Sequence, residues 1–281
     1  MLLPRILTAL ALLLVLGTVL LVPDPLAFDL FMALAVSAAL WEWLRLSLAD
    51  ARDGSSQSRA AVWLALGFGL LLIALRTLPS GRPALDWLGD SPLFPALSFW
   101  WVVVLIPFYL RKADPAQAPR SPGLSLFAPF ALFGAWYGAV AAFEQGPLFL
   151  LSLLALVWVA DIGAYFIGRR FGRRKLAPAI SPGKSIEGAI GGCALSVVFV
   201  LISAAYPGTF GAALVARWGV VLAAVFAAVL AIISVGGDLF ESLLKRRAGR
   251  KDSSSLLPGH GGVLDRIDAL IPVLPVTVVL L

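Results

Sequence analysis

Long hydrophobic runs alternate with short polar segments along almost the whole chain. The runs cover residues 6–22, 26–48, 60–78, 93–110, 124–143, 147–168, 186–206 and 213–236, and a last apolar stretch covers 267–281. Polar residues separate them at 50–59, 79–90, 111–123, 169–184 and 245–258. Because a helix of about 20 apolar residues crosses the hydrocarbon core of a bilayer, this pattern predicts an all-α, polytopic integral membrane protein with about eight or nine transmembrane helices.

The two ends of the chain need separate interpretation. The first run resembles the apolar part of a signal peptide, but Pro23-Asp24-Pro25 offers no small-residue cleavage pattern, so we expect a retained first helix. The last stretch has only 15 residues, including one aspartate and two prolines. A short helix, a tilted helix and a segment that only partly enters the membrane are therefore all open for residues 267–281.

The basic residues predict how the chain is oriented. If the N-terminus is cytoplasmic and the runs cross alternately, all but three of the 22 lysines and arginines fall on the cytoplasmic side. The three exceptions are Arg76, Arg82 and Arg217. Because cytoplasmic loops of membrane proteins are enriched in Lys and Arg, we expect a cytoplasmic N-terminus, with the two most basic segments on one face.

Composition narrows the classes of function. Hydrophobic residues make up 60% of the chain and charged residues 14%, whereas soluble domains carry about 25% charged residues. The net charge of +6 follows from the basic loops, and no basic segment is interleaved with aromatic residues, so we expect no nucleic acid partner. The single cysteine, Cys193, excludes an intramolecular disulfide and a zinc site built from several thiolates.

No fixed repeat and no long linker divides the chain. We therefore separate only N-terminal transmembrane helices, residues 1–120, from a region at 121–281 that carries two polar blocks, 161–188 and 236–268. Outside these blocks, Asp29 and Glu42 lie within the second hydrophobic run. Glu42 stands between two tryptophans and near Arg45, so an interfacial anchor is the expected role of this glutamate.

The first polar block begins with Asp161 at the end of a hydrophobic run. A carboxylate inside a membrane helix is either functional or satisfied by packing against a neighbouring helix, and both alternatives stay open for Asp161. Lys175 and Lys184 are point charges suited to phosphate, and Ser181-Pro182 is expected to cap and start the next helix. A P-loop is excluded because Pro178 stands where that motif requires glycine. Three glycines of this block, Gly163, Gly168 and Gly172, allow close approach of helices or backbone.

The second polar block gathers acidic residues, basic residues and a glycine pair. Helical spacing places Asp238 and Glu241 on one face, and likewise Asp265 and Asp268. Carboxylates beside many cations suit a divalent metal with a polyphosphate, since oxygen ligands hold Mg²⁺ and cations neutralise the remaining phosphate charge. A solvated juxtamembrane loop explains the basic residues alone. We expect irregular backbone at Gly236-Gly237 and at Gly261-Gly262, lining a wet cavity.

The only histidine of the chain, His260, lies in this second block beside Gly261 and Gly262. Zinc is not expected there, because neither a second histidine nor a cluster of cysteines is available. The glycines allow the backbone to approach a phosphate, and the imidazole can donate a hydrogen bond to it. A structural role and a substrate contact are both open for this side chain.

At these residues the sequence resembles the phosphatidate cytidylyltransferase (CDP-diacylglycerol synthase) family. The family's C-terminal signature is matched without a gap from Ser242 to Asp268. Its matched positions are Ser242, Lys245-Arg246, Lys251-Asp252, Ser254, Leu257-Pro258, His260-Gly261-Gly262, Asp265-Arg266 and Asp268. The block 161–188 is similar to a second family block, except that Ser185-Ile186 stands where Thr-Trp is more usual. The first 120 or so residues agree in hydropathy only.

The resemblance implies a reaction of CTP with phosphatidate that gives CDP-diacylglycerol and pyrophosphate. It also implies dependence on Mg²⁺, with a second, monovalent cation left open, about nine transmembrane helices and a homodimer. The implied metal ligands are Asp238 and Asp265, followed by Asp161, Asp268 and Glu241 as ligands or their supports. The residues implied to contact CTP or the phosphatidate headgroup are Lys175, Ser181, Lys184, Ser242, Lys245, Arg246, Lys251, His260 and Arg266, with Asp238, Asp265, Lys245 and His260 as the catalytic set.

Two rival functions differ in what they require. A secondary transporter would use Asp161 and Asp238 to carry ions, but the charges crowd one predicted face and no inverted repeat is visible. Another lipid-phosphate transferase or a polyprenol kinase is disfavoured by the gapless match. CTP is cytosolic and both polar blocks fall on the predicted cytoplasmic side, so we expect an enzyme of the bacterial plasma (inner) membrane whose active site faces the cytoplasm.

Overall fold

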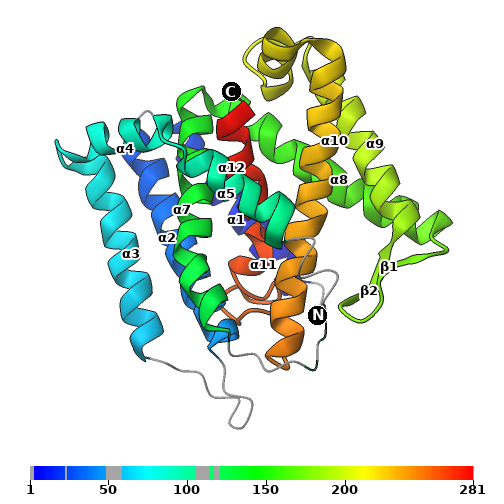
Figure 1. Ribbon diagram of the computed structural model, residues 1–281, viewed down its shortest axis with the longest axis horizontal. Helices are drawn as coiled ribbons and strands as arrows, with labels where there is room; N and C mark the ends of the chain where they lie inside the picture. Colours follow the sequence, from blue (N-terminus) through cyan, green and yellow to red (C-terminus); the bar gives the residue numbers. More distant parts are fainter. Residues whose placement is uncertain are drawn as a thin grey trace. The chain divides into compact units, whose positions relative to one another are not determined.

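The computed structural model describes residues 3–22, 24–48, 59–105, 114, 116 and 121–280, and it is almost entirely helical (Figure 1). The helices and the two strands of the described chain are α1 (Leu3–Leu21), α2 (Pro25–Ser47), α3 (Arg59–Thr77), α4 (Gly81–Asp90), α5 (Leu93–Phe99), the π-helix η1 (Trp100–Leu105), α7 (Pro122–Glu144), α8 (Pro147–Phe171), β1 (Lys175–Ala177), β2 (Ser181–Ser185), α9 (Ile186–Ser203), α10 (Phe210–Arg247), α11 (Leu264–Ile267) and α12 (Leu270–Leu280).

The prediction of an all-α membrane protein is confirmed at this level. Within the described chain, α2, α3, α7, α8, α9 and α10 are each long and apolar enough to cross a bilayer. Residues 10–21, 93–103 and 270–280 form shorter apolar helices. The total number of spans and the side of the N-terminus stay predictions, and residues 49–58, 106–113 and 117–120 of the predicted runs and polar segments lie outside the described residues.

Several predicted boundaries were wrong. Part of the polar segment 79–90 forms helix α4, and residues 175–185 form a short antiparallel β-hairpin that the all-α prediction lacked. The run 213–236 belongs to a longer element, because α10 extends to Arg247 and bends at Gly219, whose φ of 75° is not helical. Hydropathy ends a helix where charges begin, yet Lys and Arg are good helix formers and favourable in a last turn.

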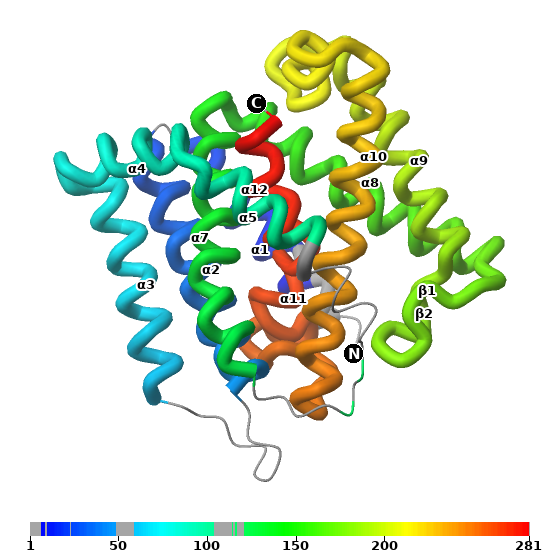
Figure 2. The backbone as a smooth tube through the Cα atoms, viewed as in Figure 1, coloured from blue at the N-terminus to red at the C-terminus, as the bar shows by residue number. Residues whose placement is uncertain are grey.

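The described chain folds into two compact units. Unit 1 comprises Met1–Leu93, Ala116–Trp136 and Leu244–Ile267, and unit 2 comprises Phe94–Pro115, Tyr137–Leu243 and Asp268–Leu281. In unit 1, α2 packs against α1, α3 and α11, and the ribbon shows α2 and α3 running side by side (Figure 1). In unit 2, α8 packs along α9, and the hairpin β1–β2 connects them, as the tube drawing shows (Figure 2).

Small residues allow α8 and α9 to pack closely. A Cβ atom on Gly192 would collide with the carbonyl oxygen of Ala160, and one on Gly188 would meet the backbone of Ala164 and Gly168. The expectation of close approach at Gly163, Gly168 and Gly172 is thereby confirmed, since each would collide with a side chain or backbone of the segment 185–195. Such small-residue interfaces are typical of helix pairs in membranes, where packing replaces the hydrophobic effect.

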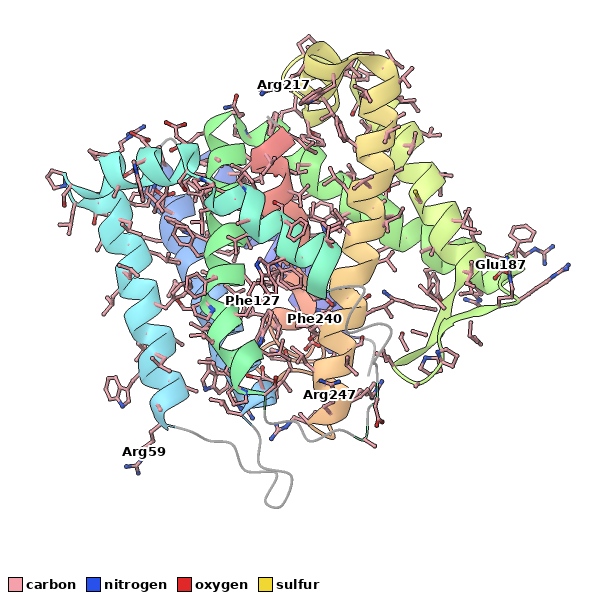
Figure 3. The ribbon with its side chains drawn as sticks, in the orientation of Figure 1. Arg59, Phe127, Glu187, Arg217, Phe240 and Arg247 are labelled. Atoms are coloured by element: carbon pink, nitrogen blue, oxygen red, sulfur yellow. The ribbon has the colours of Figure 1, made fainter. Side chains whose placement is uncertain are left out.

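The basic residues are distributed within each unit as the topology prediction requires. In unit 1, Arg59 at the start of α3 and Arg247 at the end of α10 lie toward the same end of the unit (Figure 3). In unit 2, Arg217 lies at the opposite end of the unit from Glu187, which stands next to the hairpin (Figure 3). Arg217 is one of the three residues predicted for the non-cytoplasmic side.

The α8–α9 interface predicts the effect of a single methyl group. Gly192→Ala should lower the thermal stability of the purified protein, because overpacking against a backbone carbonyl costs about 1–3 kcal/mol. Gly67→Ala is the matched control: the same methyl group meets nothing within 4 Å on α3, so stability should stay the same or rise slightly. Thermal unfolding in detergent, followed by light scattering or fluorescence, compares the two, and equal stabilities would contradict this packing.

Candidate active site

Helix α10 carries most of the chemistry of the second polar block. Because it extends beyond residue 236, Asp238, Glu241, Ser242, Lys245 and Arg246 all have helical backbone. The helix then ends at Gly249, whose φ of 64° suits glycine and whose N–H donates to the carbonyl oxygen of Arg246. The Arg250 N–H donates to the carbonyl oxygen of Lys245 at 2.8 Å, which closes this terminus.

In unit 2, a lysine of the hairpin reaches a carboxylate of α10. Lys184 Nζ lies 2.6 Å from Asp238 Oδ2, and Ser242 Oγ donates to Asp238 Oδ1 at 3.2 Å. The side chains of Lys184 and Asp238 are 26% and 30% exposed, so solutes can reach them. Asp161 of α8 interacts electrostatically with both charges. Asp161, Lys184, Asp238 and Ser242 are hereafter called the Asp238 cluster.

The hairpin that holds Lys184 is built by local pairing. Lys175 is opposite Ser185 and Ala177 is opposite Ser181, and Ile180 donates its N–H to the carbonyl oxygen of Ala177 in the turn. Lys175 is exposed, and it lies on the strand opposite the one that carries Lys184. The structure thus places Lys175, Ser181 and Lys184 on one short hairpin, although only Lys184 has a described ion pair.

The expectation that Ser181-Pro182 caps the next helix was wrong, because both residues belong to β2. Ser185 is the N-cap instead, and its hydroxyl accepts a hydrogen bond from the Gly188 N–H at 3.1 Å. Glu187, in the first turn of α9, accepts from the N–H groups of Arg173 and Arg174 at 3.0 and 3.1 Å. Ser185 directly precedes an apolar run, which is the signal that could have identified it.

In unit 1, Asp265 lies at the centre of a dense network. Its Oδ1 accepts from Lys245 Nζ at 2.6 Å. Its Oδ2 accepts from Ser253 N at 2.9 Å, Ser253 Oγ at 2.8 Å and Gly262 N at 2.7 Å. The side chains of Lys245 and Asp265 are only 13% and 4% exposed. Lys245, Ser253, Gly262 and Asp265 are hereafter called the Asp265 cluster.

The expected role of Glu42 as an interfacial anchor was wrong. Its side chain is completely buried in unit 1, where it accepts hydrogen bonds from Ser253 Oγ, Ser254 Oγ, Val263 N and Leu264 N. Arg45 instead stacks over the ring of Trp41, 4.5 Å from its centroid. Sequence reasoning missed the role of Glu42, because its partners follow it by more than 200 residues.

The glycine pairs behave differently from one another. Gly261 has a φ of 85°, which confirms irregular backbone at this position. Gly236 and Gly237 lie within α10, so irregular backbone was wrong for them. Gly237 is needed for packing, because a Cβ atom there would meet the carbonyl oxygen of Asp268 and the ring of Pro272. A Cβ atom on Gly262 would collide with Ser253 Oγ and with both carboxylate oxygens of Glu42.

The remaining candidate residues occupy varied environments. His260 donates its N–H to the carbonyl oxygen of Leu257 and accepts from Arg266 Nη2 at 2.8 Å through its own carbonyl, so Arg266 braces this loop. The His260 Nδ1 atom is buried and has no hydrogen-bond partner among the described residues. Arg246 and Lys251 are exposed, whereas Glu241 is only 2% exposed. Asp268 follows α11 and accepts from the N–H of Ala269.

These residues include a fitting ligand set for Mg²⁺ only when substrate phosphates are counted. Within the described chain, no three carboxylate, histidine or cysteine side chains form a protein-only metal site. Magnesium in nucleotide sites typically takes one or two carboxylates together with phosphate oxygens and water. Asp161 and Asp238 fit this requirement, since they offer oxygen ligands that interact with one another and Asp238 is partly exposed. Asp265 already accepts four hydrogen bonds, including one from Lys245.

Comparison with known proteins gives one consistent result. The model of the "Cytidylyltransferase family" matches residues 3–281. The phosphatidate cytidylyltransferase of Pseudomonas aeruginosa is 41% identical over 285 residues, covering 100% of this chain and 97% of that protein. The protein of the same name from Haemophilus influenzae is 34% identical over 98% of this chain and 96% of its own length. The one from Thermotoga maritima is 44% identical over 67% of this chain and 69% of its own length. The chain therefore belongs to the cytidylyltransferase family.

Proposed function

We propose that this protein transfers the cytidylyl group of CTP to phosphatidate, which forms CDP-diacylglycerol and releases pyrophosphate, a step of phospholipid biosynthesis. The observation that carries this proposal is the match over the full length to bacterial relatives named phosphatidate cytidylyltransferase. The enzyme is an integral membrane nucleotidyltransferase. We assign it to the bacterial plasma membrane, with CTP reaching the polar blocks from the cytoplasm.

The chemistry requires little covalent help from the protein. A phosphate oxygen of phosphatidate attacks the α-phosphorus of CTP and forms the new P–O bond. The bond from the α-phosphorus to the bridging oxygen breaks, and its electron pair leaves with pyrophosphate. Because the nucleophile is already anionic, the main obstacle is the repulsion between two polyanions, so catalysis depends on positioning and on positive charge.

The two clusters suit this requirement in different ways. In unit 2, the partly exposed Lys184 can exchange its ion pair with Asp238 for a phosphate oxygen, and Ser242 can add a hydrogen bond. In unit 1, Lys245 is held by Asp265 in one geometry and is mostly buried. The exposed Lys175, Arg246 and Lys251 supply further positive charge toward the substrates.

We propose Mg²⁺ as the cofactor, with Asp161 and Asp238 as ligands from this chain, and with Asp265, Asp268 and Glu241 as supports of the two clusters. The bound ion would neutralise phosphate charge and stabilise the pyrophosphate leaving group. Asp238 would hold its ligand oxygen in place through the Ser242 hydroxyl. We further propose that the enzyme acts as a homodimer, which light scattering of the purified protein in detergent would test.

The reaction itself is tested by incorporation of labelled CTP into chloroform-soluble lipid. We expect product from purified protein only with phosphatidate and Mg²⁺. Asp265→Asn should lower the rate about 100-fold or more, because its amide would place a donor against the donors around Asp265 and remove the charge paired with Lys245. Asp86→Asn, at an exposed carboxylate of α4, is the control and should stay active. A wild-type protein that binds CTP but leaves phosphatidate unmodified would show that the acceptor is wrong.

The role of Lys184 is tested by removing its charge alone. Lys184→Met keeps the apolar stem, and we expect kcat/KM for CTP to fall roughly 10- to 100-fold, as for the loss of one hydrogen bond to a charged group. Arg217→Met is the matched control, since it removes a positive charge from the same unit at the end predicted to face away from the cytoplasm. Equal kinetics for the two variants would remove Lys184 from the substrate-binding set.

The orientation is tested by labelling single cysteines. In a Cys193→Ser background, Gly183→Cys places a thiol at an exposed position of the hairpin, and Tyr206→Cys places one at an exposed position between α9 and α10. A membrane-impermeant maleimide should label residue 183 only in inside-out vesicles and residue 206 only in intact spheroplasts. The reverse pattern would place the hairpin, and with it Lys184, outside the cytoplasm.

A further inference from the structure

The segment between α10 and α11 contains little regular structure, yet its backbone is fixed at defined points. Leu257 and Gly261 form an isolated bridge, and the carbonyl oxygen of Pro258 accepts from Thr8 Oγ1 at 2.8 Å. The largest number of its described side-chain contacts leads to two carboxylates, Glu42 and Asp265. Asp265 belongs to the sequence signature, whereas Glu42 comes from α2, in a part of the chain without a recognisable motif.

We propose that Glu42 is a positioning residue for the cytidylyltransferase reaction: it fixes the loop 253–264 and thereby the geometry of the Asp265–Lys245 pair. The inference rests on the proposed function and adds a residue outside both sequence blocks. Glu42 does not contact Lys245 in the structure and would act only through the loop. Its contacts define how that action is transmitted.

The first part of the argument is the set of bonds that Glu42 makes. Oε1 accepts from Ser254 Oγ at 2.5 Å and from Val263 N at 3.1 Å, and Oε2 accepts from Leu264 N at 2.6 Å and from Ser253 Oγ at 3.0 Å. Each oxygen thus ties the start of the loop to its end. A completely buried carboxylate is tolerated only where hydrogen bonds compensate for its desolvation, so these four contacts are a requirement of the fold.

The second part is the route from Glu42 to Asp265. Ser253 Oγ lies between the two carboxylates, 3.0 Å from Glu42 Oε2 and 2.8 Å from Asp265 Oδ2. A hydroxyl has one hydrogen and can donate it to only one carboxylate at a time. The Ser253 N–H also donates to Asp265, so a displacement of Ser253 is transmitted directly to the carboxylate that holds Lys245.

The third part is the space reserved for Glu42. Gly262 donates its N–H to Asp265 Oδ2, and the position of its missing side chain is occupied by the carboxylate of Glu42 and the hydroxyl of Ser253. The same glycine therefore has to approach both carboxylates. This contact gives Gly262 a physical role that differs from a close approach of its backbone to a phosphate.

The experiment compares two substitutions on helix α2. Glu42→Gln keeps the size of the side chain but replaces one acceptor oxygen with an NH₂ donor that faces other donors. Asp29→Asn is the matched control: Asp29 is also buried, pairs with Arg76 at 2.8 Å, and lies about 20 Å from Glu42 along the helix at 1.5 Å per residue. Both variants remove one buried carboxylate from the same helix.

Two readouts separate positioning from a general loss of stability. Hydrogen exchange followed by mass spectrometry should show faster exchange of the loop 253–264 in Glu42→Gln by at least about 10-fold, and no change there in Asp29→Asn. In steady-state kinetics, Glu42→Gln should lower kcat roughly 10- to 100-fold while KM for CTP stays near that of the wild type. Ser254→Ala, a milder change at the loop itself, should shift both quantities in the same direction.

The possible results discriminate clearly. Wild-type exchange of the loop in both Glu42→Gln and Ser254→Ala would overturn the proposal, and so would losses of kcat that follow thermal stability equally in Glu42→Gln and Asp29→Asn. If Glu42→Gln does not fold, Ser254→Ala decides by the same two readouts. Hydrogen exchange does not require turnover, so an inactive wild type with the expected exchange pattern would contradict the proposed reaction and leave the anchoring role of Glu42 supported.

Discussion

A backbone amide or carbonyl buried in a membrane protein has no water to bond, and the rest of this structure depends on how that requirement is met. Most of the described chain satisfies it with helices. The segment between α10 and α11 does not form a helix, so its N–H groups need other acceptors. Two carboxylates supply them: Asp265 accepts from Ser253 N and Gly262 N, and Glu42 accepts from Val263 N and Leu264 N. Irregular backbone is therefore possible where the chemistry requires it.

The same constraint explains why charges are paired in both units. Lys184 with Asp238 in unit 2 and Lys245 with Asp265 in unit 1 each bring an ammonium group to 2.6 Å from a carboxylate. The pairs differ in exposure, and this difference suggests different duties. A partly exposed pair can open to admit an anionic substrate, whereas a buried pair loses much stability when either partner is removed. Helix α10 contributes a residue to each pair, which is why its extension to Arg247 matters.

Close packing of small residues has a comparable role in the framework. The contacts of Gly188 and Gly192 with α8 hold α8 and α9 together, and the hairpin that carries Lys184 connects precisely this pair of helices. Gly237 allows the backbone at Asp268 and Pro272 to approach α10 within unit 2. The position of the functional side chains thus rests on sites where a methyl group would not fit.

The sequence by itself determined the class of protein, the approximate position of most helices and the family. These properties depend on composition, on the length of apolar runs and on residues that are close together in the chain. It also identified Asp238, Lys184, Lys245 and Asp265 as candidates, because charged residues in a hydrophobic chain stand out against their surroundings. It did not predict the hairpin at 175–185, the cap at Ser185 or the full length of α10, since hydropathy contains no information on hydrogen bonding at helix ends.

Only the tertiary structure decided which candidates meet and which residue supports them. Lys184 and Asp238 are more than 50 residues apart, and Glu42 is separated from Ser253 by 211 residues. Nothing in the local pattern around Glu42 distinguishes a buried acceptor from an interfacial anchor, because hydrophobic neighbours suit both. That distinction depends on which donors the fold brings to the carboxylate, and those donors belong to a loop whose shape is fixed only after the helices have packed.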